Sequence, residues 1–137
     1  MSYADGAPGN TSGVELMTKL PPEPVSASVA RQFVRGGLAR SRFGNIVDEA
    51  TAVADELVTN GILHGRTELQ LTVTEMGRRL RVEVLDGNTR IPVQSHVGVD
   101  ATSGRGLDIV AAISRSWGCD ERNGGKVVWC ELASRRG

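Results

Sequence analysis

The chain contains few residues that could form disulfides or bind a metal cluster. It contains only 2 cysteines, Cys119 and Cys130, and 2 histidines among its 137 residues. Such a pair of cysteines cannot form the framework of a disulfide-rich secreted domain, and no Cys/His group has the spacing of zinc ligands. We therefore expect reduced thiols, and we expect the fold to be held together by its hydrophobic core.

The chain also lacks a net charge and long apolar segments. Its 16 basic residues balance its 16 acidic residues, so no strong field favours nucleic acid or an anionic membrane surface. No apolar run approaches the roughly 20 residues of a membrane-spanning helix, and residues 1–10 lack the charged start and apolar stretch expected of a signal peptide. We expect a cytoplasmic protein with no direct nucleic-acid or membrane partner.

The length predicts one domain with a single hydrophobic core. A chain of 137 residues can bury such a core without disulfides or structural metals. Residues 1–13 are rich in Gly, Ser, Asn and Pro, which predicts a flexible N-terminal tail. The domain itself is expected over residues 14–134.

Hydrophobic spacing predicts strands and helices in separate groups. The expected order is strand, helix, helix, strand, strand, helix, strand and strand, over residues 14–20, 26–41, 45–64, 69–73, 80–84, 106–114, 116–122 and 126–133. Residues 87–104 have no usable periodicity, which is typical of a functional loop or lid. Because the elements are grouped rather than strictly alternating, they favour an α/β fold of the two-layer sandwich type. Its sheet is expected to be mixed and mostly antiparallel, with helices on one face.

The second predicted helix has a recognisable start and stop. Asn45 is suited to the N-cap and Gly65 to the residue after the last turn. Its apolar stripe is expected to consist of Ile46, Ala50, Val53, Leu57 and Ile62. This helix carries the most informative polar residues of the chain.

Glu56 and Asn60 on this helix carry the first functional hypothesis. They are four residues apart, which places them on one helical face. A carboxylate there can accept a proton, and an amide oxygen can ligate a hard cation such as Mg²⁺. His64 extends this face by one turn; it could contact a phosphate or order the lid, but a role at the negative end of the helix dipole is the preferred interpretation. A solvated polar stripe would have the same spacing.

Two further segments combine polar residues with special backbone requirements. Asp86-Gly87-Asn88 ends a predicted strand, and its carboxylate can accept a hydrogen bond from an exocyclic amine such as that of adenine. An Asx turn is the structural alternative. The second segment, before a predicted helix, consists of Thr102, Ser103, Gly104, Arg105, Gly106 and Leu107. Glycines there let the backbone approach a ligand, and a helix N-terminus binds anions, so this segment suits phosphates.

The segments around Glu56, Asp86 and Gly104, in this order along the chain, resemble the motifs of the GHKL superfamily of ATP-binding domains. Within it, the chain is most similar to the small stand-alone anti-sigma factor serine/threonine kinases of bacteria. The resemblance covers roughly Leu20 to Leu132, nearly all of the predicted domain. The matching blocks are residues 56–60 with His64-Gly65, Asp86, residues 102–107 and residues 124–129. Several ordered blocks are much more specific than any one of them.

The resemblance implies an ATP- and Mg²⁺-dependent protein serine/threonine kinase on a Bergerat-type ATP-binding fold. Glu56 would be the general base that deprotonates the attacking hydroxyl, and Asn60 would ligate Mg²⁺. Asp86 would bind the amine of adenine. The other residues implied in nucleotide binding are His64, Asn88 and residues 102–107. Kinase chemistry is mostly positioning and charge stabilisation, so these groups could suffice.

The resemblance also implies regulation of a sigma factor by partner switching. The phosphoacceptor would be a STAS-type anti-sigma factor antagonist, the sequestered target a sigma factor, and a homodimer is the family expectation. The alternative is a non-catalytic partner-binding module on the same fold, with weak or no ATP binding. Two departures favour it. Asp86 is followed by Gly87-Asn88 instead of the usual x-Gly-x-Gly, and Val127 stands where relatives often carry a threonine that helps water bridge the aspartate to adenine.

The closing hairpin carries the remaining expectations. If Gly124-Gly125 forms its two-residue turn, Cys119 and Cys130 fall directly opposite each other. Reduced thiols packed on the sheet remain the expectation. Lys126 follows the turn and is expected to be solvated. The aromatic residues expected in the core are Phe33, Trp117 and Trp129.

Overall fold

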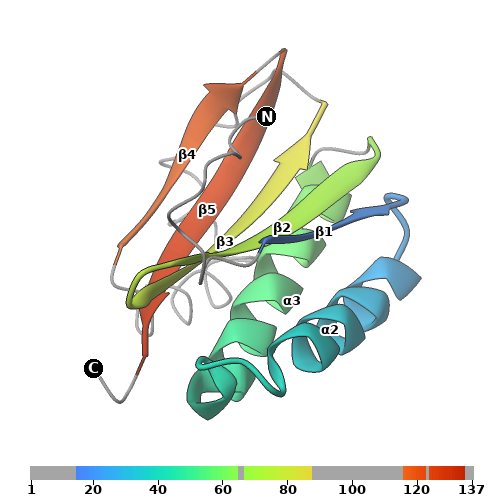
Figure 1. The fold of residues 1–137 in the computed structure, drawn as a ribbon. Coiled ribbons are helices and arrows are strands. Elements are labelled where there is room, and N and C mark those ends of the chain that lie inside the picture. Colours follow the sequence, from blue (N-terminus) through green and yellow to red (C-terminus); the bar gives the residue numbers. More distant parts are fainter. Residues whose placement is uncertain (1–14, 65–66, 88–115, 123, 135–137) are drawn as a thin grey trace.

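The chain folds as a two-layer α/β sandwich, with one five-stranded sheet and two helices on one of its faces (Figure 1). The computed structural model describes residues 15–64, 67–87, 116–122 and 124–134. The predicted N-terminal tail, long loop and third helix lie outside these residues. The fold class predicted from the sequence is confirmed.

The elements follow the predicted order. Their bounds are β1 (Glu15–Leu20), α2 (Val25–Leu38), the 3₁₀ turn η2 (Gly44–Ile46), α3 (Val47–His64), β2 (Leu69–Met76), β3 (Arg79–Asp86), β4 (Ser116–Arg122) and β5 (Gly125–Ala133). In the described part of the chain, no helix is both long enough and apolar enough to cross a bilayer.

The strand order is β1-β2-β3-β5-β4, and every neighbouring pair is antiparallel. The sequence predicts a mixed sheet, so this detail is wrong for the described strands. The β2–β3 and β4–β5 pairs are hairpins, and a short connection forces antiparallel pairing. Because β1–β2 and β3–β5 are antiparallel as well, no two neighbouring strands of the described sheet are parallel.

The start of α3 differs from the prediction. The sequence predicts Asn45 as the N-cap, but Asn45 lies inside η2 and the α-helix begins at Val47. Asp48 and Glu49 then occupy the first turn, where negative charge is favourable against the helix dipole. The last residue of α3 is His64, as predicted.

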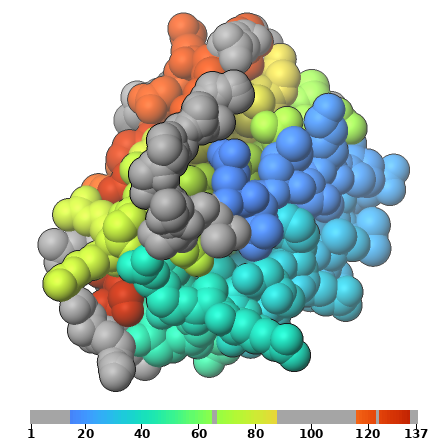
Figure 2. All heavy atoms as spheres, viewed as in Figure 1, coloured from blue at the N-terminus to red at the C-terminus, as the bar shows by residue number. Residues whose placement is uncertain are grey.

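The core lies between the sheet and the two helices. Residues directly opposite each other on neighbouring strands project from the same face, and on the helix-facing side they are mostly apolar. The largest fully buried side chains are Phe43, Leu38, Leu57, Leu69, Leu71, Leu80, Leu132, Val34, Val53, Val58, Val73 and Val82. Figure 2 shows the blue-green atoms of α2 and α3 packed together along one side of the molecule. Of the predicted apolar stripe, which begins in η2 and continues along α3, only Ile62 is outside the buried class.

A network of ion pairs covers the face of the sheet that points away from the helices. Arg81 is its centre, with nitrogen atoms 2.6 Å from Glu83 and 2.8 Å from Glu131. Burial raises the pKa of Glu83, but hydrogen bonds from Arg81 and Arg122 outweigh burial and hold this pKa below its usual value. The guanidinium of Arg81 also lies 4.3 Å from the ring centroid of Trp129. The prediction that Trp129 belongs to the core is therefore wrong, whereas Phe33 and Trp117 pack against the core as predicted.

The closing hairpin turns one residue earlier than predicted. Arg122 pairs with Gly125, so residues 123–124 connect the strands, and Gly124 has a φ of +81°. An Asn-Gly pair is the strongest short signal for a two-residue hairpin turn, and its glycine readily adopts this positive φ. The earlier turn shifts the register of the whole hairpin by two residues.

The shifted register separates the two cysteines. Cys119 pairs with Val128, and Cys130 pairs with Trp117. The cysteine pairing that a Gly124-Gly125 turn would produce is therefore not formed, and neither cysteine takes part in a disulfide, as expected. Burial raises the pKa of the Cys119 thiol, which makes this thiol a poor nucleophile at neutral pH.

Gly125 brings the start of β5 against the end of β3. A Cβ atom at this position would overlap the carbonyl oxygen of Asp86, and backbone cannot move aside as a flexible side chain does. We expect Gly125→Ala to lower the free energy of unfolding by about 1–3 kcal/mol in a urea titration. Gly36 on α2 is the matched control, because a Cβ there meets nothing within 4 Å. Gly36→Ala should raise stability by about 0.5–1 kcal/mol, and equal effects of the two substitutions would contradict the close approach.

Candidate functional site

The C-terminal half of α3 brings Glu56 and Asn60 to the end of the sheet where Asp86 lies. Gly61, the neighbour of Asn60, packs so closely on β2 that a Cβ atom would lie 2.9 Å from Leu69 Cδ2. Leu69 is directly opposite Asp86 across β2 and β3. The missing side chain at Gly61 thus lets the helix approach the strands. The structure places the predicted metal ligand and the predicted adenine-binding residue at the same end of the domain.

Asn60 presents a buried acceptor atom. Its residue is 8% exposed, and its Oδ1 has no hydrogen-bond partner among the described residues. Leaving a buried acceptor unpaired costs about 1–3 kcal/mol, so such an atom requires an explanation. Oxygen is the ligand type that Mg²⁺ prefers. The buried amide oxygen therefore fits the metal-binding role implied for Asn60.

The described residues offer no complete metal cage of their own. No group of three or more His, Cys, Asp or Glu side chains among them could hold a metal ion. Mg²⁺ in proteins is commonly held by few protein ligands together with substrate phosphates and water. Asn60 thus fits a metal that arrives with a phosphate ligand better than it fits a permanent structural ion.

Glu56 lies one turn before Asn60 and is half-buried. Burial, and then the negative charge of Asp55, raise the pKa of Glu56 above its usual value. Arg31 of α2 holds Asp55 at 3.3 Å. A carboxylate with a raised pKa is a stronger proton acceptor, which is what a general base requires.

The remaining predicted phosphate ligands are only partly described. His64 is the last residue of α3 and is exposed. A histidine at this position interacts favourably with the negative end of the helix dipole. The other predicted ligands lie outside the described residues and stay predictions: Asn88, Thr102, Ser103, Gly104, Arg105, Gly106 and Leu107.

Asp86 is held in a buried ion pair that the sequence does not predict. Lys126 Nζ lies 3.0 Å from Asp86 Oδ2, and both side chains are 3% exposed. The two residues are directly opposite each other across β3 and β5, so both project towards the helices. The prediction of a solvated Lys126 is wrong, because alternation along β5 puts this residue on the same face as the buried Val128 and Cys130. Apart from the ion pair, Nζ has no hydrogen-bond partner among the described residues.

Val127 lies on the other face of the sheet from the Asp86 carboxylate. It pairs with Leu85, and successive side chains of a strand point to opposite faces. A threonine at position 127 would therefore not place its hydroxyl beside Asp86. Lys126 is the residue that faces the carboxylate, so the inferred loss of a hydrogen-bond partner at Val127 is wrong.

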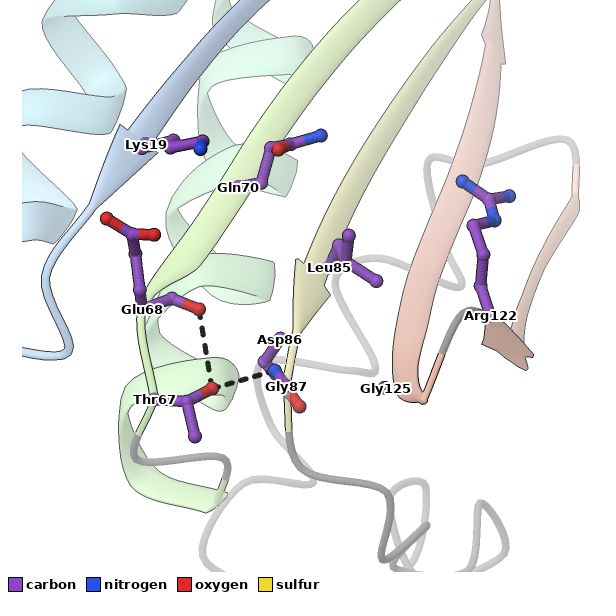
Figure 3. Close-up of a pocket in the computed structure, with 9 residues that line it drawn as sticks. All are labelled: Lys19, Thr67, Glu68, Gln70, Leu85, Asp86, Gly87, Arg122 and Gly125. Carbon is purple, nitrogen blue, oxygen red and sulfur yellow. Dashed lines mark hydrogen bonds between the residues drawn. The ribbon is translucent and has the colours of Figure 1, made fainter.

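Thr67 holds the backbone that follows Asp86. Its hydroxyl oxygen accepts a hydrogen bond of 2.8 Å from the Gly87 N–H, and the hydroxyl donates to the carbonyl oxygen of Glu68 at 3.3 Å (Figure 3). The contact joins residues that are 20 positions apart. No local sequence signal marks Thr67, and sequence reasoning therefore missed it.

A cavity of about 290 Å³ opens at the same strand ends, on the face of the sheet away from the helices (Figure 3). Lys19, Gln70, Leu85 and Arg122 project beside it. The register places these side chains on the opposite face from the carboxylate of Asp86. The sheet thus separates this cavity from Asn60 and Glu56.

Comparison with known proteins identifies the fold but no close relative. No family model matches the chain, and no curated protein matches it in sequence. Among solved structures, it is similar to the Acinetobacter baumannii histidine kinase AdeS, with a TM-score of 0.55 and 9% sequence identity. The match covers 87% of this chain and 68% of that chain. The chain has a histidine-kinase-like fold. At this identity the likeness extends to the fold alone, and the anti-sigma factor branch remains a prediction.

Proposed function

We propose that the chain is an ATP-binding regulatory protein that transfers the γ-phosphate of ATP to a serine or threonine of a partner protein. The observation that carries the proposal is the buried Oδ1 of Asn60, which has no hydrogen-bond partner among the described residues and lies one helical turn from the half-buried Glu56. The fold supports it, since the similar chain AdeS is named as a kinase.

Each described residue of the site has a distinct role in this proposal. Asn60 would hold Mg²⁺ through Oδ1, and Mg²⁺ supplies positive charge that offsets the charge of the phosphates. Glu56 accepts the proton of the acceptor hydroxyl. As that proton leaves, the hydroxyl oxygen forms its bond to the γ-phosphorus, and the bond between this phosphorus and the oxygen of ADP breaks. Asp86 accepts a hydrogen bond from the amine of adenine.

The proposed partners follow from the sequence resemblance. The phosphoacceptor is a STAS-type anti-sigma factor antagonist, and the regulated target is a sigma factor. Phosphorylation adds negative charge to the antagonist, which can break or create an interface. The proposed outcome is partner switching by a homodimer of this chain.

One observation favours the alternative, a partner-binding module with weak or no ATP binding. The ammonium of Lys126 already binds the carboxylate of Asp86 at 3.0 Å. A base amine that approaches this carboxylate therefore has a strong competitor in place. If the competitor excludes adenine, the chain would act through protein contacts alone.

Transfer of labelled γ-phosphate separates the two functions. The chain is incubated with Mg-ATP and a purified STAS-type antagonist, and label on serine or threonine of the antagonist is measured. The kinase proposal predicts label that requires the chain, the antagonist and Mg²⁺ together. A complex between the chain and the antagonist without any label would favour the binding module.

A further inference from the structure

We propose that Lys126 donates a hydrogen bond to N1 of the adenine base, next to the exocyclic amine from which Asp86 accepts a hydrogen bond. In this arrangement, the Asp86–Lys126 pair reads the edge of the base, and Lys126 is a specificity-determining residue. The inference rests on the proposed function, because it requires an adenine nucleotide at Asp86.

Lys126 has donor capacity that the described residues do not use. An ammonium group carries several N–H donors and no acceptor. Nζ lies 3.0 Å from Asp86 Oδ2, and beyond this ion pair it has no hydrogen-bond partner in the described part of the chain. At 3% exposure the side chain also has little access to bulk water. Buried charged groups are normally both paired and hydrogen-bonded, so the remaining donors call for an acceptor.

A second buried atom at the same end of the domain, the acceptor Oδ1 of Asn60, also lacks a hydrogen-bond partner among the described residues. Over the described residues, Lys126 Nζ and Asn60 Oδ1 are the two buried side-chain atoms without a hydrogen-bond partner. Gly61 packs on Leu69, which is opposite Asp86, and Asp86 is opposite Lys126. The two atoms thus lie at one end of the sheet, on its helix-facing side. A magnesium nucleotide would bring a cation to the acceptor and a base acceptor to the donor.

The ion pair matches the edge of adenine in its order of donor and acceptor. Adenine presents an amine donor beside the acceptor N1, and the pair presents a carboxylate acceptor beside an ammonium donor. A carboxylate can accept several hydrogen bonds, so Asp86 can bind the ammonium and the amine at once. Lys126 then contributes to base recognition instead of competing with the base.

The backbone around the pair is fixed before any ligand binds. The missing side chain of Gly125 lets β5 approach the carbonyl of Asp86, and Thr67 binds the N–H of Gly87 at 2.8 Å. The register then sets Lys126 directly opposite Asp86. A site whose groups are held in place discriminates more strongly between ligands, because fewer groups must be ordered on binding.

Nucleotide analogues test the inference on the wild-type chain. Binding of Mg-ATP is compared with that of 1-deaza-ATP, in which a C–H group replaces N1, and with that of purine riboside triphosphate, which lacks the amine. We expect 1-deaza-ATP to bind about 10- to 100-fold more weakly than ATP. Loss of the amine should weaken binding through Asp86. Affinity of 1-deaza-ATP within about twofold of ATP would overturn the role of Lys126 and leave the proposed function standing. If ATP itself does not bind, both fail.

The Lys126→Met variant provides the second arm. ATP should bind this variant more weakly, and its preference for ATP over 1-deaza-ATP should disappear, because methionine has no donor to lose. Lys19→Met is the matched control, since Lys19 is exposed and lies on the other face of the sheet, and it should keep the full preference. Circular dichroism establishes that each variant is folded. If folded Lys126→Met keeps the full preference for ATP over 1-deaza-ATP, a group other than Lys126 recognises N1. If this variant does not fold, the analogue series on the wild-type chain decides whether N1 is recognised.

Discussion

The Lys126→Met chain is expected to unfold with a free energy about 3–5 kcal/mol below that of the wild-type chain. The reason lies in what remains after the substitution. The substitution would remove one partner of an ion pair in which both side chains are 3% exposed, and breaking a buried pair from one side is strongly destabilising. Methionine fills much of the volume of the lysine stem, so little of the loss comes from a cavity. Urea unfolding at neutral pH measures the difference.

The chain offers a matched control for this substitution. Arg35 and Asp48 also form an ion pair at 3.0 Å, but their side chains are 54% and 81% exposed. Arg35→Met should therefore cost less than about 1 kcal/mol. The double variant Asp86→Leu/Lys126→Met should recover most of the loss, because it removes both charges together. Equal costs for Arg35→Met and Lys126→Met would show that the Asp86–Lys126 pair is not buried in solution.

Replacement of Glu56 by glutamine is expected to lower the rate of γ-phosphate transfer by about 10²- to 10⁴-fold, the usual contribution of a general base. Glutamine keeps the size and polarity of the side chain but cannot accept the proton of the attacking hydroxyl. ATP affinity should change little, because in the proposed mechanism Glu56 contacts the acceptor hydroxyl and not the nucleotide. Single-turnover transfer to the STAS-type antagonist, measured beside ATP binding, separates these two effects.

Loss of stability would not explain such a result. The pKa of Glu56 is raised in the folded chain, so the folded state binds this proton more tightly than the unfolded state does. The stabilisation from protonated Glu56 is present at acidic pH and is lost as the pH rises through the raised pKa. At neutral pH, the glutamine variant should thus be as stable as the wild-type chain or slightly more stable, within about 0.5 kcal/mol.

Glu49→Gln is the control for chemistry. Glu49 lies on the same helix, in its first turn, about two turns before Glu56. This variant should transfer phosphate at the wild-type rate. If Glu56→Gln also labels the antagonist at the wild-type rate, Glu56 does not carry the proton.

Sequence periodicity predicted those parts of the fold that depend on local pattern. The helix that carries Glu56 and the β2–β3 hairpin follow directly from their spacing of apolar residues. The register of the closing hairpin could not be settled in this way, because Asn123, Gly124 and Gly125 allow more than one two-residue turn. The position of β5 between β3 and β4 also has no local signal, since it depends on contacts between distant segments.

The same distinction applies to the candidate site. Glu56 and Asn60 share a helix, and their common face could be predicted from a spacing of four residues. Alternation along β5 puts Lys126 on the face of Val128 and Cys130, but the carboxylate that pairs with it lies 40 residues earlier in the chain, which its neighbours do not reveal. Sequence reasoning therefore found the helix face that carries Glu56 and Asn60 and missed the residue that faces Asp86.

Isothermal titration calorimetry with ATP, with and without Mg²⁺, measures whether the chain binds a magnesium nucleotide. We expect saturable binding of ATP that strengthens when Mg²⁺ is present, because the buried Oδ1 of Asn60 would ligate the ion. Asn60→Leu, which replaces the amide by an apolar side chain of similar size, should remove most of this dependence on Mg²⁺. If the folded wild-type chain at high micromolar concentration gives no binding heat with Mg-ATP, it is not a nucleotide-binding protein of the proposed kind.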